Sequence, residues 1–156
     1  MQNKQALQRA NLLALAIPAG LLAGAYIGEL AFGLFPCEMC WWQRYPHFVA
    51  VILALIGFVA QPRKLWIGLA ALAVLVSGLI GGFHAGVEYG WWEGLTACSN
   101  GAAAKGGDPL AAIFDTPLVT CNDVQWSLIG ISLAGWNFLV SLAGAAAIAA
   151  QVRKAG

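Results

Sequence analysis

The sequence predicts an all-α polytopic membrane protein, built as a bundle of four transmembrane helices with two loops on its outer side. Of its 156 residues, 60% are hydrophobic and 10% are charged, whereas a soluble domain averages about 25% charged residues. Each of four stretches without Asp, Glu, Lys or Arg is long enough to cross the hydrocarbon core as a helix. These stretches are residues 10–28, 45–62, 65–87 and 124–152. They do not alternate between apolar and polar residues, so helices are favoured over the strands of a barrel.

The elements follow in chain order within one domain, residues 1–156. We expect the membrane spans at about residues 11–34, 45–60, 65–86 and 124–150. The first span, which follows Lys4 and Arg9, also resembles a signal peptide. Its apolar run is longer than a typical signal-peptide core, so we expect it to be retained as a span. Between the second and third spans, residues 61–64 are expected to form a tight turn.

The distribution of Lys and Arg predicts the orientation in the membrane. Four spans place both termini and the turn at residues 61–64 on one side. That side then holds six of the eight cationic side chains: Lys4, Arg9, Arg63, Lys64, Arg153 and Lys154. Because short loops rich in Lys and Arg stay cytoplasmic, we expect all four cysteines on the outer face. Disulfides persist in an oxidising compartment of that kind.

Two smaller features concern packing and the second outer loop. Glycines recur at every fourth position in the first and third spans, as Gly20, Gly24, Gly28, Gly78, Gly82 and Gly86. Such patterns let helix backbones approach closely, and we expect packing inside the chain's own bundle rather than a dimer. In the second outer loop, residues 108–115 are expected to form a short helix at the membrane interface, with an irregular loop as the alternative.

The first pair of cysteines, Cys37 and Cys40, stands in a C-x-x-C motif just before the second span. This spacing lets the two sulfurs meet across one turn, and a helix that starts here would favour the thiolate of Cys40. Arg44 follows by one helical turn and would favour the same thiolate. We therefore expect a redox-active pair. The alternatives are a structural disulfide and an arginine that extends to the lipid headgroups.

The second pair, Cys98 and Cys121, lies in the long outer loop. As a disulfide it would stabilise that loop by about 3–4 kcal/mol, and taken alone this structural interpretation is favoured. Beside a reactive C-x-x-C motif we instead expect the two pairs to exchange, because thiolate exchange needs a second disulfide within reach. A zinc site is not expected, because structural zinc usually draws its ligands from two close pairs.

Two histidines lie near the outer ends of the spans. His84 stands one helical turn before Glu88 in the third span, and His47 is about one turn deeper than Arg44 in the second. A polar group at this depth could hydrogen-bond the carbonyl oxygens of a lipid-soluble acceptor or relay protons to it. The alternative is a satisfied polar pair that joins helix ends. We expect His84, together with Arg44 and Cys40, to bind such an acceptor.

These motifs together resemble the DsbB family of bacterial inner-membrane thiol oxidoreductases, over nearly the whole chain. The resemblance rests on the four spans and on a set of motifs, which are Cys37-x-x-Cys40-x-x-x-Arg44, Gly86-Val87-Glu88 followed by Trp92 and Cys98, and Cys121-x-x-x-x-Trp126. The stretch before Arg44 lacks the acidic residue that some members carry there. The resemblance therefore names no partner for Arg44.

The resemblance implies an enzyme that reoxidises a soluble, DsbA-like periplasmic thiol oxidase and passes the electrons to a membrane quinone, either ubiquinone or menaquinone. It implies that Cys98 forms the mixed disulfide with the partner and that Cys121 passes electrons to Cys37. Cys40 would then reduce the quinone beside Arg44. The protein would lie in the bacterial inner membrane with both termini in the cytoplasm and its cysteine loops in the periplasm. We expect no nucleic-acid partner.

Two other functions stay open at this point. An enzyme like vitamin K epoxide reductase would use related chemistry, but that family carries its C-x-x-C motif in its last core spans, whereas here the motif follows the first span. A non-enzymatic four-span scaffold or small transporter would hold the cysteines in two structural disulfides that are inert to exchange.

Overall fold

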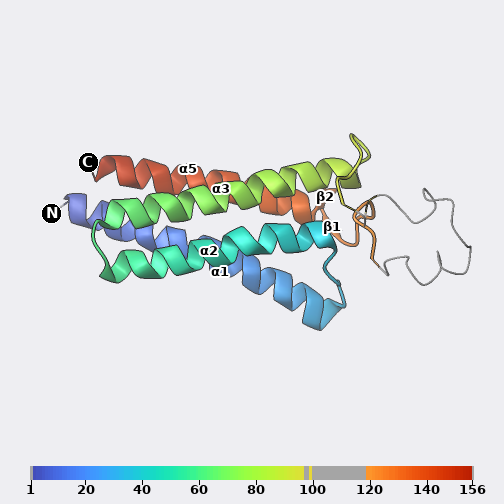
Figure 1. Cartoon of the computed structure of the whole chain (residues 1–156), viewed down its shortest axis with the longest axis horizontal. Coiled ribbons are helices and arrows are strands. Elements are labelled where there is room, and N and C mark those ends of the chain that lie inside the picture. Colours follow the sequence, from blue (N-terminus) through green and yellow to red (C-terminus); the bar gives the residue numbers. More distant parts are fainter. Residues whose placement is uncertain (1, 97–98, 100–118, 156) are drawn as a thin grey trace, which may run out of the picture.

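Four long helices lie side by side in the computed structural model (Figure 1), which describes residues 2–96, 99 and 119–155. They are α1 (Gln2–Phe32), α2 (Glu38–Val59), α3 (Arg63–Glu88) and α5 (Leu133–Lys154). Each is long and apolar enough to cross a membrane, so the predicted fold class is confirmed and the chain is an all-α, multi-pass membrane protein. Cys98 and the short helix expected at residues 108–115 lie outside the described residues.

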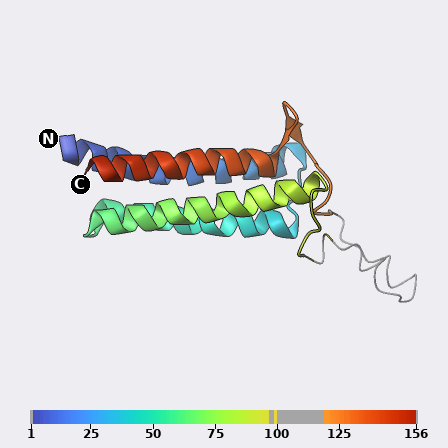
Figure 2. The ribbon, with the colours of Figure 1, turned by 90° about the horizontal axis from the view of Figure 1, so that it is seen from above.

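The helices form a closed bundle in which each packs mainly against two neighbours. α3 packs against α2 and α5, and α1 packs against the other sides of the same two helices. Figure 2 shows this arrangement as two layers, α1 with α5 and α2 with α3. Near the termini the helices meet through fully buried side chains, which are Ala10, Ala14, Ala54, Ile67, Ala70 and Ile148. The four alanines among them are small residues of the kind that let membrane helices approach closely.

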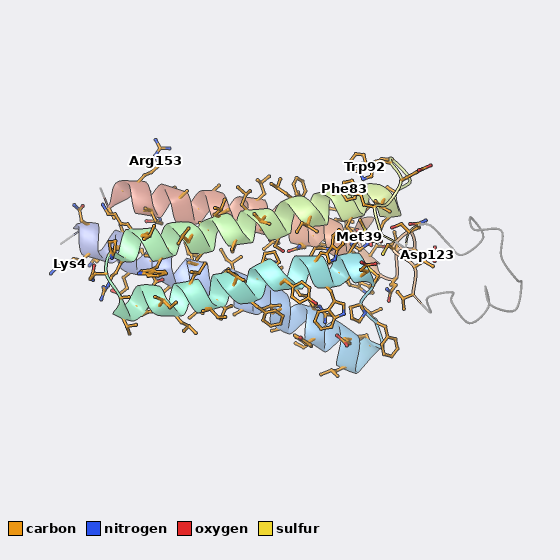
Figure 3. All side chains as sticks on the ribbon, viewed as in Figure 1. Lys4, Met39, Phe83, Trp92, Asp123 and Arg153 are labelled. Atoms are coloured by element: carbon orange, nitrogen blue, oxygen red, sulfur yellow. The ribbon has the colours of Figure 1, made fainter. Side chains whose placement is uncertain are left out.

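The two ends of the bundle carry different groups. Both termini and the turn between α2 and α3 lie at one end, and the connection from α1 to α2 lies at the other (Figure 1). Lys4 and Arg153 mark the first end, and Asp123 marks the second (Figure 3). Because Cys37 directly precedes α2, the C-x-x-C motif lies at the end opposite the termini.

Three helices begin at other residues than the predicted spans. α1 begins at Gln2 rather than near residue 11, because the polar N-terminal residues continue the helix beyond its apolar stretch. α2 begins at Glu38 rather than near residue 45, because the segment that contains Glu38 and Arg44 continues the helix beyond its uncharged stretch. The fourth span, predicted from residue 124, begins only at Leu133. The residues before α5 instead form an antiparallel hairpin of β1 (Ser127–Leu128) and β2 (Ile131–Ser132).

The physical reason for the late start of α5 is the turn of this hairpin. Ile129 and Gly130 both have positive φ, 56° and 75°, as a tight two-residue hairpin turn requires and as a right-handed helix does not allow. Ser132 then caps α5, because its hydroxyl accepts a hydrogen bond from the backbone N–H of Gly135 at 3.2 Å. The absence of charged residues predicts an apolar segment here, but it does not indicate the residue at which the helix begins.

The two glycine patterns have different roles. A Cβ atom added at Gly78 would lie 2.8 Å from the Ser141 side chain of α5, and one at Gly82 would meet α5 as closely. Close packing of α3 within the bundle is therefore confirmed. A Cβ atom added at Gly20 or Gly24 would meet no atom within 4 Å. The prediction that these α1 glycines serve close helix packing is wrong, because they border open space.

Candidate active site

Cys37 and Cys40 lie at the start of α2 with their sulfur atoms 2.8 Å apart. Cys37 is the extended residue just before the helix, and its sulfur accepts a hydrogen bond from the backbone N–H of Cys40 at 3.3 Å. Ser, Thr, Asp or Asn usually fills this capping role. Cys40 therefore stands in the first turn of α2, where the helix dipole favours negative charge, as the sequence predicts.

The two sulfurs of this pair have different environments. Cys37 is 4% exposed, whereas Cys40 is partly exposed. The hydrogen bond shared with the thiol of Cys40, and then burial, raise the pKa of Cys37 well above its usual range. Of the two, Cys37 is thus the sulfur that keeps its proton, and Cys40 is the one placed to react as a thiolate.

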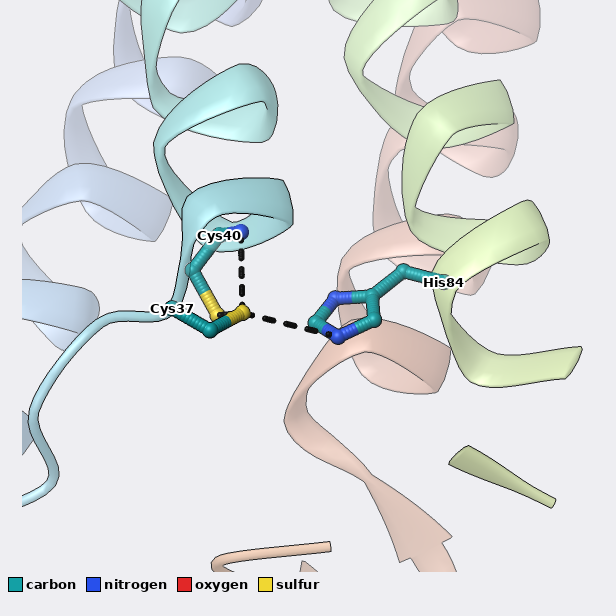
Figure 4. A group of neighbouring side chains, drawn as sticks. All are labelled: Cys37, Cys40 and His84. Atoms are coloured by element: carbon teal, nitrogen blue, oxygen red, sulfur yellow. Dashed lines mark hydrogen bonds between the residues drawn. The ribbon is translucent and has the colours of Figure 1, made fainter. Parts of the chain in front are cut away.

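His84 reaches this pair from α3 (Figure 4), and its Nε2 lies 3.6 Å from the sulfur of Cys37. Glu88, one turn later on α3, has a carboxylate oxygen 3.9 Å from the same nitrogen. The sequence suggests that His84 lies beside a lipid-soluble acceptor. In the structure the ring lies against the Cys37 sulfur and also lines the neighbouring cavity.

This cavity has a volume of about 270 Å³ and lies among α1, α2, α3 and α5. Most of its wall is apolar, and α1 contributes Gly20 and Gly24, from which no side chain projects. Cys40, Arg44 and His84 also line it. The three residues that the sequence suggests for acceptor binding therefore share one cavity.

Arg44 is 6% exposed and is held by groups from two helices. Its Nη1 donates a hydrogen bond to the Glu29 carboxylate of α1 at 2.8 Å. Its guanidinium carbon lies 4.8 Å from the ring centre of Tyr26 and 4.9 Å from that of Trp41, within the range of cation–π contacts. The acidic partner of Arg44 thus comes from another helix, not from the residues just before it. Because its guanidinium is buried and paired, Arg44 is not the exposed side chain that an extension to the headgroups would require.

Cys121, from the second predicted pair, packs against the first pair. It is fully buried in one cluster with Cys37, Met39 and Val87. The hydroxyl of Thr96 lies 3.4 Å from its sulfur. The fold therefore brings a cysteine of the second outer loop next to the C-x-x-C motif, as exchange between the two pairs requires.

A chain of buried and half-buried polar side chains continues from His84 into the bundle. Gln43 donates to Nδ1 of His84 at 2.9 Å, and Asn137 donates to Oε1 of Gln43 at 2.8 Å. His47, which the sequence suggests as a second acceptor-binding residue, instead pairs through Nε2 with Oδ1 of Asn137 at 2.9 Å. Sequence reasoning missed Gln43 and Asn137. The sequence feature that points to them is an amide side chain within an otherwise apolar span, because such a polar group rarely lies in a membrane without a hydrogen-bond partner.

Cys37, Cys40 and His84 also bring their possible metal-binding atoms within 4.8 Å of one another, and this donor set is one that zinc accepts. The hydrogen bond from Gln43 to Nδ1 leaves the hydrogen of the neutral His84 ring on Nε2. That nitrogen faces the sulfur of Cys37 and would need a free lone pair to bind a metal. The hydrogen bonds therefore favour thiol chemistry over coordination.

Several known proteins of similar sequence carry the name of one family. The family described as Disulfide bond formation protein DsbB matches residues 7–151. A Disulfide bond formation protein B of Marinobacter nauticus is 31% identical over 134 residues, which cover 80% of this chain and 79% of that protein. Proteins of the same name from Verminephrobacter eiseniae and Polaromonas sp. are each 32% identical, over 82% and 85% of this chain and 75% and 82% of their own lengths. No solved structure matches significantly. Because the family match spans all four helices and the cysteine motifs, this chain belongs to the DsbB family of disulfide bond formation proteins.

Proposed function

We propose that this protein reoxidises a soluble, DsbA-like thiol oxidase and passes the electrons through its two cysteine pairs to a membrane quinone. As a DsbB-family member it is a membrane protein of disulfide bond formation, and the proposal concerns its two redox partners. One observation carries it. The pair Cys37–Cys40 packs against Cys121 and also lines the cavity that Arg44 lines. A dithiol so placed can exchange with a protein disulfide and also deliver electrons to a carrier dissolved in lipid.

The proposed exchange moves one disulfide bond at a time. The reduced partner attacks Cys98 and releases Cys121 as a thiolate, which then attacks Cys37 and releases Cys40. Two features support this order. Cys121 shares a buried cluster with Cys37, so the attacking sulfur comes from a neighbouring residue. Cys40 stands in the first turn of α2, where the helix dipole favours the thiolate that leaves.

The cavity has the chemistry that a quinone requires. Its apolar wall suits a flat ring and the start of an isoprenoid tail, and Arg44 offers N–H donors for a carbonyl oxygen. We propose that Arg44, His84 and Cys40 hold the ring of a ubiquinone or a menaquinone. When bound, this group accepts an electron pair and protons. On the protein side, Cys40 lines the cavity, supplies the thiolate and is reoxidised with Cys37.

We propose the bacterial inner membrane as the location, with both termini in the cytoplasm and the cysteine loops in the periplasm. The cationic residues Lys4 and Arg153 lie at the end that holds the termini (Figure 3), and segments rich in such residues stay cytoplasmic. Exposed apolar side chains along the helices, such as Leu55 and Leu72, would face the lipid.

A coupled assay tests this function. The purified protein in detergent is mixed with a reduced DsbA-like oxidase and a short-chain ubiquinone or menaquinone, and quinol formation is followed by absorbance. We expect quinol to form in proportion to the thiols oxidised, and we expect Cys40→Ser and Cys98→Ser to abolish this coupling. Gln61→Glu, at the exposed inner turn, is a control that should retain it. Four cysteines that are inert to the partner would instead support a scaffold with structural disulfides.

A further inference from the structure

The hydrogen-bond chain from Asn137 through Gln43 to His84 determines which nitrogen of His84 faces the reactive sulfurs. We propose that Gln43 and Asn137 are positioning residues, which hold the neutral His84 ring with its Nε2–H directed at Cys37. This N–H stabilises the Cys37 thiolate when thiol exchange releases it. The inference rests on the proposed function, because it assigns a role within the exchange between the two cysteine pairs.

Backbone carbonyls, which can only accept hydrogen bonds, fix the orientation of both amides. Nδ2 of Asn137 lies 3.2 Å from the carbonyl oxygen of Ser77, so this atom must be the amide nitrogen. Nε2 of Gln43 lies 3.2 Å from the carbonyl oxygen of Met39 and must also be nitrogen. The two amides then match, since Asn137 donates to Oε1 of Gln43 at 2.8 Å. Turning either amide over would bring two acceptors together.

This orientation leaves one choice for the His84 ring. Gln43 donates to Nδ1 at 2.9 Å, so Nδ1 carries a lone pair and Nε2 carries the hydrogen of the neutral ring. Nε2 is the nitrogen that lies 3.6 Å from the sulfur of Cys37 (Figure 4). The carboxylate of Glu88 is farther from it, at 3.9 Å. The ring also forms a hydrogen bond with the backbone of Cys121, so the N–H of His84 is directed toward the sulfur of Cys37 and the neighbouring Cys121 backbone.

The helices around the two amides leave them little freedom to move. A Cβ atom added at Gly81 would lie 2.9 Å from Nδ2 of Asn137 and 3.0 Å from Oε1 of Gln43, so this amide pair fits only beside a glycine. Ser77 donates to the backbone carbonyl of Gln43 at 2.7 Å, and Ser141 donates to Oδ1 of Asn137 at 3.0 Å. A buried polar network with its partners in place is costly to rearrange.

The hydrogen bond of His84 serves the step that releases Cys37. In that step the thiolate of Cys98 attacks the sulfur of Cys121 in a Cys37–Cys121 disulfide. The Cys98–Cys121 bond forms, the Cys37–Cys121 bond breaks, and Cys37 leaves with the electron pair. Negative charge then arises on a buried sulfur, where it is costly without a hydrogen bond. His84 supplies that bond, transfers no proton and stays neutral.

Nitrogen-15 NMR tests the orientation directly, because the chain contains only two histidines. The full-length protein, labelled on histidine, is measured in detergent micelles, and His84→Gln identifies the signals of His84. We expect the ring to be protonated at Nε2, and we expect Gln43→Met to abolish this preference. Gln61→Met, the same change at the exposed inner turn, should leave the spectrum unchanged. A ring protonated at Nδ1 in the unaltered protein would overturn the inference, and this result needs no variant to fold.

A single-turnover measurement without quinone tests the role of His84 in exchange. Oxidised protein is mixed with the reduced DsbA-like oxidase, samples are quenched and alkylated, and the release of the Cys37 thiol from the Cys37–Cys121 disulfide is followed by mass spectrometry. We expect His84→Leu and Gln43→Met to slow exchange roughly ten- to hundredfold, the effect of losing one hydrogen bond to a charged group. His84→Gln should restore much of the rate, because its amide N–H can replace Nε2–H without titrating.

The possible failures are distinguishable. If the unaltered protein does not exchange with the partner, the proposed function is wrong and the role of His84 falls with it. If the unaltered protein exchanges normally and His84→Leu is as fast, only the role of His84 is wrong. Gln61→Met serves as the matched control and should exchange at the unaltered rate.

Discussion

The guanidinium of Arg44 and the carboxylate of Glu29 lie 2.8 Å apart, although they belong to different helices. This ion pair joins α2 to α1 beside the cavity that both helices line. A buried charge without a partner is strongly destabilising. Glu29 therefore compensates the charge that Arg44 places on the cavity wall, one helical turn from Cys40.

The first prediction concerns Arg44. We expect Arg44→Ala to raise the KM for quinone roughly tenfold or more, because a charged hydrogen-bond donor is lost from the cavity. Thiol exchange with the partner should change little, since it involves the cysteines and not the quinone. Arg44→Lys should recover only part, because an ammonium group lacks the planar fork of donors. Quinone titrations and quinone-free exchange rates provide the two measurements. An unchanged KM in Arg44→Ala would reduce this residue to a link between helices.

The second prediction concerns the division of roles between the loop cysteines. In Cys121→Ser, the free Cys98 thiolate attacks the disulfide of the oxidised partner, which forms a mixed disulfide and releases one partner thiol; because no second loop thiol can resolve this bond, the partner should stay covalently attached. Non-reducing electrophoresis followed by mass spectrometry would identify the linked residue, and Cys98→Ser is the matched control. A partner attached to Cys37 or Cys40 in Cys121→Ser would contradict the two-pair relay.

The third prediction follows from the raised pKa of Cys37. At any pH below a raised pKa, a smaller fraction of the thiol is ionised, and only the thiolate alkylates rapidly. In the reduced protein we therefore expect iodoacetamide to modify Cys40 first and Cys37 only slowly until the solution is strongly alkaline. The largest cause of the shift is the hydrogen bond with Cys40, so Cys40→Ser should change the pH dependence of Cys37. Peptide mass spectrometry over a pH series measures both residues, and equal rates at neutral pH would refute the assignment.

The fourth prediction compares two glycines. Gly81→Ala would press a methyl group against the Asn137 and Gln43 amides, and we expect it to destabilise the fold by about 1–3 kcal/mol, as overpacking does. Gly24→Ala places the same group in open space and should be neutral or stabilise its helix by roughly 0.5–1 kcal/mol. Thermal unfolding in detergent measures both variants. Equal losses would mean that the two sites are packed alike.

The fifth prediction concerns orientation. With the cysteine loops in the periplasm, a membrane-impermeant thiol reagent applied to whole cells after mild reduction should label Cys98. A cysteine introduced at Gln61, in the turn between α2 and α3, should be labelled only after the inner membrane is opened. The reverse pattern would invert the topology that the Lys and Arg distribution predicts.

The sequence alone was sufficient to predict the features that depend on the spacing of residues along one helix or on the properties of the bilayer. Four helical spans could be predicted because a bilayer allows no unpaired backbone groups and few charges. The placement of Cys40 and Arg44 on one cavity follows from their separation by one helical turn at the start of α2. Spacing along one helix fixes which side chains share a face, whatever the other helices do.

Features that depend on two distant helices could not be predicted in this way. Glu29 comes from α1, and Asn137 comes from α5, so their contacts with α2 require the packed bundle.

The hairpin before α5 was missed for a different reason. Its turn places Ile129 at positive φ, which a branched side chain rarely adopts, so the sequence there carries no turn signal at its first position.

The side of the cavity that α1 contributes includes three glycines, Gly20, Gly24 and Gly28, beside Leu21, Leu22 and Ala25. Gly20 and Gly24 leave room for larger groups, so each position can accept added atoms without displacing a neighbour. The width of the site can therefore change through α1 alone, while the cysteines and Arg44 stay as they are. A lineage that came to depend on a bulkier or a slimmer electron carrier would find its adaptive substitutions on this helix, away from the residues that perform the chemistry.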